Sequence, residues 1–207
     1  MASQAVADPL GKTSAGKHSV GKIGMWIFVV SDVFMFAGFL IALAFLRGGA
    51  GWRCTEALAV AGDCDVPEPN LAVGFALALT AVLAASSFTM VKAARARTRQ
   101  RTLLWLGLTI AGGALFLCGQ AHEWSALRHA GLLFGASHYA TTFYVITGFH
   151  GAHVLAGVAI LAFVWHRTSQ DRAVGSDEVA IAGLFWQLVD AIWLFILCAV
   201  YLVGTRS

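Results

Sequence analysis

Five apolar segments, each about long enough to cross a lipid bilayer, limit what this chain of 207 residues can fold into. An α-helix needs roughly 20 apolar residues to span about 30 Å of hydrocarbon. Helices are expected because backbone groups in lipid must be paired within the segment, and these segments lack the alternation of barrel strands. The expected helices are Gly24–Leu46, Asn70–Val91, Leu103–His122, Tyr139–Trp165 and Val179–Val203. The sequence therefore predicts an all-α, polytopic membrane protein whose single five-helix domain covers residues 23–207.

Lys and Arg residues are distributed unevenly over the segments between these helices. Ten of the 14 fall in the N-terminal segment and in the second and fourth connections, which share one side of an up-and-down bundle. Because cytoplasmic segments are enriched in Lys and Arg, the asymmetry predicts a cytoplasmic N-terminus. The net charge of +3 is then a signal of orientation, and no nucleic-acid partner is expected. Residues 1–22 are expected to form a mobile cytoplasmic tail, without the pattern of a cleavable signal peptide.

Polar side chains at membrane depth usually face the interior of a helix bundle and often mark function. The candidates for such buried polar positions are Asp32, Glu123, His150, His153, Gln187 and Asp190. At about 1.5 Å of rise per residue, the ionisable groups at positions 32, 150, 153 and 190 reach similar depths. Burial favours the neutral acid at Asp32. Its alternatives are a hydrogen bond to another helix, proton sensing or contact with a lipid headgroup.

One face of the fourth predicted helix is polar and small. With 100° between successive residues, about a third of the circumference carries Thr147, His150, His153 and Gly157. Gly148, Gly151 and Gly157 are expected to let another helix approach closely. This face is interpreted as a seam between helices whose histidines hydrogen-bond to neighbours, with proton handling and metal or haem ligation as the alternatives. Ligation would require further His, Met or Cys residues at matching depth, and the segments contain none.

Two of the four cysteines, Cys54 and Cys64, fall in the connection after the first helix. This connection would lie in an oxidising compartment, where a disulfide between them is an alternative to two independent thiols. Cys118 and Cys198 lie within helices and are interpreted as packing residues. No closely spaced Cys and His set supports a structural zinc site.

Motifs in order along all five segments resemble subunit III of the haem-copper respiratory oxidases. The family's opening stretch is similar to GMWIFVVSDVFMFAGF, which contains Ser31 and Asp32. Its later stretches resemble ASSFT (85–89), GQAHEW (119–124), YATTFYVITGFHGAHVLAG (139–157) and FWQLVDAIWLF (185–195). Gln187 departs from the family's usual His, and its amide does not titrate near neutrality. Asp32 replaces the commonest Glu.

The resemblance implies a short, five-helix form in which the first two helices and the last three make a V that holds phospholipid. Asp32, Glu123 and His150 would line or support that cleft. The family role is a non-redox subunit of a bacterial cytochrome c oxidase in the inner membrane, with no cofactor in this chain and with haem and copper in partner subunits. It binds subunit I and subunit II, stabilises subunit I and supports proton uptake, and cytochrome c is the donor to the complex.

Other functions remain open from the sequence. A quinol oxidase subunit III and the accessory protein of nitric-oxide reductase systems resemble the same family. An independent proton-coupled transporter would predict inverted repeats or helices broken at mid-membrane. The sequence has neither feature, because the glycines of the fourth segment are spaced for packing.

Overall fold

The computed structural model describes residues 14–47, 73–170 and 176–202. Within these ranges the chain forms five α-helices, the last of which continues into a π-helical turn called η1. The elements are α1 (Ser14–Arg47), α3 (Val73–Arg95), α4 (Arg99–His129), α5 (His138–Ser169), α6 (Ser176–Ile196) and η1 (Leu197–Leu202). All five helices are long and apolar enough to cross a membrane, which confirms the predicted fold class.

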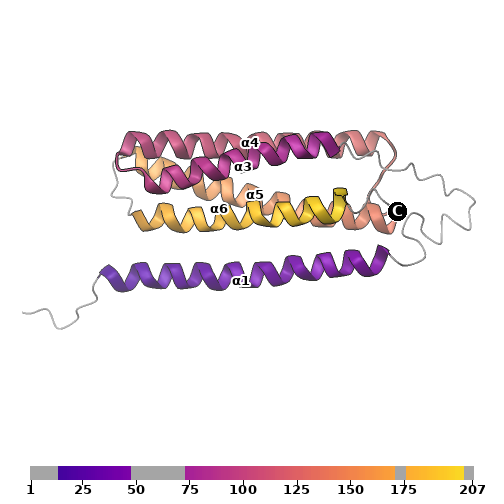
Figure 1. The fold of residues 1–207 in the computed structure, drawn as a ribbon, viewed down its shortest axis with the longest axis horizontal. Helices are drawn as coiled ribbons and strands as arrows, with labels where there is room; N and C mark the ends of the chain where they lie inside the picture. The colour runs from indigo at the N-terminus through magenta and orange to yellow at the C-terminus, as the bar shows by residue number, and fades with distance from the viewer. Residues whose placement is uncertain (1–13, 48–72, 171–175, 203–207) are drawn as a thin grey trace, which may run out of the picture.

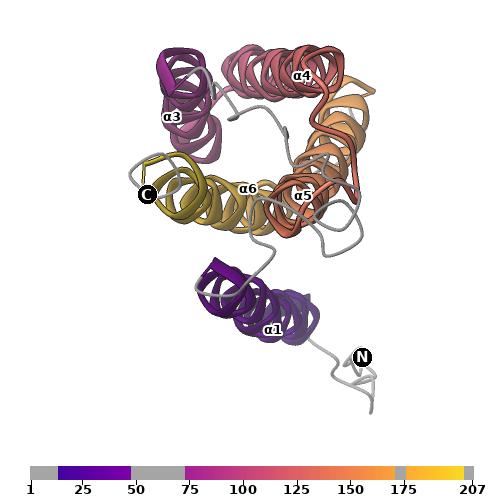
Figure 2. The ribbon, with the colours of Figure 1, turned by 90° about the vertical axis from the view of Figure 1, so that its right-hand side faces the viewer.

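Helices α3 to α6 form a four-helix bundle, and α1 lies outside it. Figure 2 shows the four helices at the corners of a square, with α1 beside α5 and α6. Helix α3 packs against α4 and α6, while α1 packs against α6 and α5. The structure thus groups the helices differently from the expected V, in which the first two helices stand apart from the last three. The reason is that the small and polar side chains of α3 face α4 and α6.

The helices extend beyond their apolar cores. Helix α1 begins at Ser14, so residues 14–22, which were expected to belong to the tail, continue the helix. Helix α4 begins at Arg99 and reaches His129. Its N-terminus is tied to the end of α5, because Nε of Arg99 donates to the carbonyl of Thr168 at 2.8 Å. These polar turns are helical because a helix pairs its own backbone groups, whatever its side chains.

The connection between α4 and α5 contains the backbone conformations that only glycine adopts easily. Gly131 and Gly135 have φ values of 88° and 87°. Ser137 then caps α5, since its hydroxyl accepts a hydrogen bond from the amide of Ala140 at 3.0 Å. This short connection makes α4 and α5 neighbours, as Figure 1 also shows.

The indole of Trp186 packs against all three of the helices that surround α6 in the bundle. Its Nε1 donates to Oγ of Ser86 on α3 at 3.2 Å. A Cβ atom on Gly113 of α4 would lie 2.4 Å from Cη2 of Trp186, and one on Gly157 of α5 would lie 2.9 Å from Cε3. Glycine at these two positions therefore leaves the space that the ring occupies.

The other predicted packing glycines of α5 behave differently from one another. A Cβ atom on Gly148 would lie 3.3 Å from Cη2 of Trp124, which is a tight contact within the bundle. A Cβ atom on Gly151 would meet no described atom within 4 Å. The prediction of close approach therefore holds at Gly157 and Gly148, and it is wrong at Gly151.

Candidate functional site

The first polar contact at membrane depth joins α1 to α5. Asp32 is 4 % exposed, and its Oδ1 lies 3.1 Å from Nε2 of His153. The other ring nitrogen of His153, Nδ1, lies 2.7 Å from the carbonyl oxygen of Phe149 one turn earlier. Phe36, one turn after Asp32 on α1, packs its ring edge-on against His153 with centroids 5.4 Å apart. Of the six candidate residues, this is the pair that the structure brings together.

His150 lies one turn from His153 but has different surroundings. Its ring stacks on Trp193 with centroids 5.1 Å apart, and Phe116 meets it edge-on at 5.8 Å. The side chain is 1 % exposed, and no described residue hydrogen-bonds to either ring nitrogen. His150 is therefore held by aromatic packing inside the four-helix bundle, without the hydrogen bond to a neighbour that was expected of the histidines on this face.

A second polar cluster forms around Glu123 on α4. Oε2 of Glu123 accepts hydrogen bonds from the hydroxyl of Tyr201 at 2.7 Å and from Nε2 of Gln120 at 3.1 Å. All three side chains are buried, and Tyr201 comes from η1. The π-helical turn thus carries the donor that ties the end of α6 to α4. Wide helical turns of this kind often occur at functional sites.

The third polar contact joins α6 to α3. Oγ of Ser87 donates to Oδ2 of Asp190, in a groove of about 400 Å³ between the two helices. Gln187 also lines this groove, but its side chain is exposed and is not enclosed by the described helices. The similar depths predicted for Asp32 and Asp190 therefore do not place them in one site.

Hydroxyl groups make several contacts between helices that the pattern of ionisable residues does not indicate. Oγ1 of Thr80 accepts from Nε1 of Trp193 at 2.9 Å, and the hydroxyls of Thr89 and Thr109 lie 2.8 Å apart. Ser86 and Ser87 belong to the ASSFT motif, which the resemblance had already singled out. Their spacing on α3 was the available signal, because adjacent hydroxyls point to different neighbours on a helix.

The two histidines of α5 differ in the contacts that their rings make. The two nitrogens of His153 contact Asp32 and a backbone carbonyl, and His150 is enclosed by aromatic rings. In the ranges that the structure covers, no group of three His, Cys, Asp or Glu side chains is placed to hold a metal ion. Cys54 and Cys64 lie outside the described residues, so their predicted pairing stays a prediction.

Comparison with known proteins agrees with the resemblance noted in the motifs. Residues 10–205 match the family described as Cytochrome c oxidase subunit III. A protein of Nocardia farcinica named "Probable cytochrome c oxidase subunit 3" is 31% identical, over 96% of this chain and 98% of its own length. The cytochrome c oxidase subunit 3 of Corynebacterium diphtheriae is 29% identical over 96% of this chain and 95% of its own. That of Alkalihalophilus pseudofirmus is 30% identical over 95% and 92%.

Proposed function

Since the chain belongs to the cytochrome c oxidase subunit III family, we propose that it is the accessory, non-redox subunit of a bacterial cytochrome c oxidase. In this role it binds beside subunit I, which carries haem and copper, and also accompanies subunit II. It stabilises subunit I during turnover, retains phospholipid and supports proton uptake. Relatives that carry the name cytochrome c oxidase subunit 3 and match along nearly their whole length support cytochrome c as the donor to the complex.

The contact between Asp32 and His153 carries this proposal. A carboxylate on α1 and an imidazole on α5, both within membrane-spanning helices, lie 3.1 Å apart in this contact. Polar groups in hydrocarbon are costly unless they find partners, so this pair stabilises the position of α1. The use of these groups for contacts between helices supports a structural role in the complex, with electron transfer left to other subunits.

The orientation in the inner membrane is also part of the proposal. The start of α1, the turn between α3 and α4 and the end of α5 lie at the same end of the molecule (Figure 1). This end carries Lys22, Lys92, Arg95, Arg97, Arg99, Arg101 and Arg167. By the positive-inside rule it faces the cytoplasm, which is the side from which the oxidase takes up protons.

Affinity purification of the natural complex through a tag on this chain tests the proposal. The complex is expected to contain a haem-bearing subunit and to give a haem signal in its reduced-minus-oxidised spectrum. Cytochrome c should then support oxygen consumption, whereas a quinol should not. Recovery of the chain without a haem protein would overturn the proposal and favour the transporter alternative.

Removal of the chain from the complex tests its stabilising role separately. The initial turnover rate per haem of the depleted oxidase is expected to be close to that of the complete complex. The depleted oxidase should, however, lose its activity after fewer turnovers. A depleted oxidase that lasts as long as the complete one would contradict this role, even if the chain copurifies with haem.

A further inference from the structure

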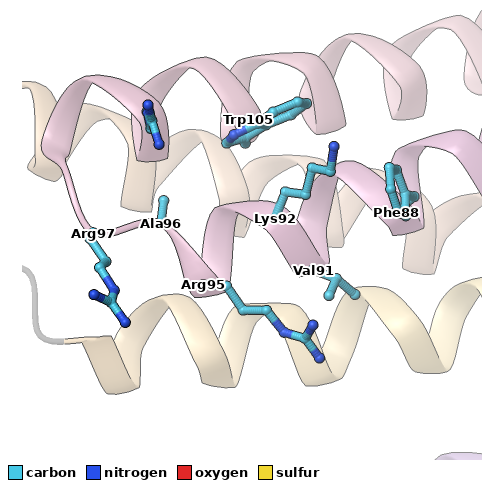
Figure 3. A pocket seen from close by; sticks show the side chains of 8 residues that line it. Phe88, Val91, Lys92, Arg95, Ala96, Arg97 and Trp105 are labelled. Atoms are coloured by element: carbon cyan, nitrogen blue, oxygen red, sulfur yellow. The ribbon is translucent and has the colours of Figure 1, made fainter.

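A basic pocket lies where α3 ends and α4 begins, and it shares Phe88 and Val91 with the groove that contains Ser87 and Asp190. Figure 3 shows Lys92 extending from α3 towards Trp105 of α4, with Arg95 and Arg97 at the end of α3 and in the turn. The pocket has a volume of about 480 Å³. Its lining consists of Phe88, Val91, Lys92, Arg95, Ala96, Arg97, Arg101 and Trp105. Four of these eight side chains are cations.

Two aromatic rings contact one of these cations, Lys92. Nζ of Lys92 lies 4.6 Å from the ring centroid of Phe88 and 4.7 Å from that of Trp105. Contacts between a cation and an aromatic face are favourable at this distance. They place the ammonium group between Phe88 of α3 and Trp105 of α4, at the wall of the pocket.

The cations of the pocket are not neutralised by the part of the chain that the structure describes. No described carboxylate forms an ion pair with Lys92, Arg95, Arg97 or Arg101. By contrast Arg167, at the same end of the molecule, pairs with Glu178 at 3.2 Å. The pocket therefore carries uncompensated positive charge, which favours an anionic ligand.

The N-terminus of α4 adds to this positive field. The first turn of α4 contains no acidic residue, and the side chain of Thr98 at the N-cap makes no capping hydrogen bond. Free amide groups and the helix dipole at such an end favour phosphate and other anions. The position of this end is fixed by Arg99, which binds Thr168, and by Nε1 of Trp165, which donates to the carbonyl of Leu103 at 3.1 Å.

The pocket combines a basic rim with an apolar side that continues into the membrane span. Its apolar side is formed by Phe88, Val91 and Trp105, and the side chain of Phe88 is 61 % exposed. A free phosphate would use the cations alone, whereas a lipid would use both the cations and the apolar side chains. We propose that this pocket binds the phosphate group of an anionic phospholipid, whose acyl chains lie along Phe88 and the outer face of α3.

This inference deepens the lipid-retaining role in the proposed function and rests on it. The test measures lipid binding to the purified oxidase complex by native mass spectrometry, with phosphatidylglycerol and phosphatidylcholine titrated in parallel. Each Lys or Arg near a membrane surface contributes about a fivefold factor in the affinity for anionic lipid. The double variant R97Q/R101Q is therefore expected to bind phosphatidylglycerol roughly 25-fold more weakly.

Two matched variants accompany the measurement. R128Q removes a cation from the other end of α4 and should leave the affinity for phosphatidylglycerol unchanged. R97K/R101K keeps both charges and should restore most of the binding, which separates loss of charge from loss of folding. Phosphatidylcholine should bind equally to all variants, and excess inorganic phosphate should not displace phosphatidylglycerol.

Several results would overturn the site. Equal binding of phosphatidylglycerol by R97Q/R101Q and the unchanged chain would exclude a role for these cations. Displacement of the lipid by inorganic phosphate would assign the pocket to soluble phosphate. Carbodiimide cross-links from Lys92 to carboxylates of another subunit, in a complex without lipid at the pocket, would assign it to a protein partner.

The same samples keep this test separate from that of the proposed function. If the complex shows its haem spectrum but its binding of phosphatidylglycerol does not depend on Arg97 and Arg101, the lipid site is rejected and the proposed function is not. A complex without haem would reject the proposed function, and the lipid titration of the purified chain would still decide the site.

Discussion

Nε2 of His153 lies 3.1 Å from Oδ1 of Asp32, and this contact joins the outlying helix α1 to α5 of the four-helix bundle. Replacing Asp32 by Ala leaves this nitrogen of His153 without its carboxylate. We expect the purified complex to lose about 1 to 3 kcal/mol of stability. This loss of stability is measured by thermal denaturation, with cleavage of α1 by protease as the signal. The haem spectrum of the assembled complex should stay the same.

Ser31→Ala provides the matched control for this variant. The Ser31 side chain is exposed on α1 and donates to the carbonyl of Phe28 in its own helix, at 2.8 Å. The control should therefore behave like the unchanged complex. An equal effect of both substitutions, or loss of the haem signal from an assembled Asp32→Ala complex, would contradict the interpretation.

Gly113→Ala should destabilise the bundle, because its new methyl group would overlap the ring of Trp186. Overpacking of this kind costs about 1 to 3 kcal/mol. Gly151→Ala adds the same methyl group on α5, where no described atom lies within 4 Å of it. The temperature at which the purified complex unfolds should fall for Gly113→Ala only. Equal midpoints for the two variants would show that the Trp186 packing is not rigid.

Tyr201→Phe and Glu123→Gln should be energetically coupled, because the hydroxyl and the carboxylate are hydrogen-bonded at 2.7 Å. A double-mutant cycle measured by thermal denaturation is expected to give an interaction of about 0.5 to 3 kcal/mol. The matched cycle pairs Glu123→Gln with Thr109→Val. Thr109 lies nearer the start of α4, and its hydroxyl is hydrogen-bonded to that of Thr89 on α3. That cycle should be additive, and coupling of similar size in both would refute a direct contact.

A disulfide between Cys54 and Cys64 should make the isolated chain lighter than its reduced form by two hydrogen atoms. Cys118 and Cys198 are free thiols in the structure, so an alkylating reagent should modify these two in the denatured, unreduced protein. After reduction all four cysteines should be modified. Alkylation of four cysteines without reduction would exclude the bridge.

The sequence predicted the five helices because each is a continuous apolar run, but it could not place their ends. Glu123, Arg128 and Arg99 are polar residues within α4, and hydropathy alone excludes such turns. Apolar runs also carry little information on which helices are neighbours. The position of α3 between α4 and α6 depends on hydroxyl contacts such as that of Ser86 with Trp186, which no hydropathy pattern identifies.

The candidate site was predictable only to the extent that buried polar residues need partners. Asp32 and His153 each required one, and both were recognised, but their pairing depends on the rotation of α1 against α5. Gln187 lies within an apolar run, yet it faces outward on α6. The carboxylate of Glu123 found its donor in Tyr201, whose direction is set by the π-helical turn η1. Local deviations from α-helical geometry of this kind have no clear signal in a single sequence.

The enclosure of Trp186 by Gly113, Gly157 and Ser86 has a consequence for how this chain can change over generations. A larger residue at position 113 or 157 would be accepted only together with a smaller one at position 186. A smaller residue at position 186 would lack the indole N–H that donates to the hydroxyl of Ser86, so Ala could then replace Ser86. The residues at positions 86, 113, 157 and 186 should therefore covary among related proteins.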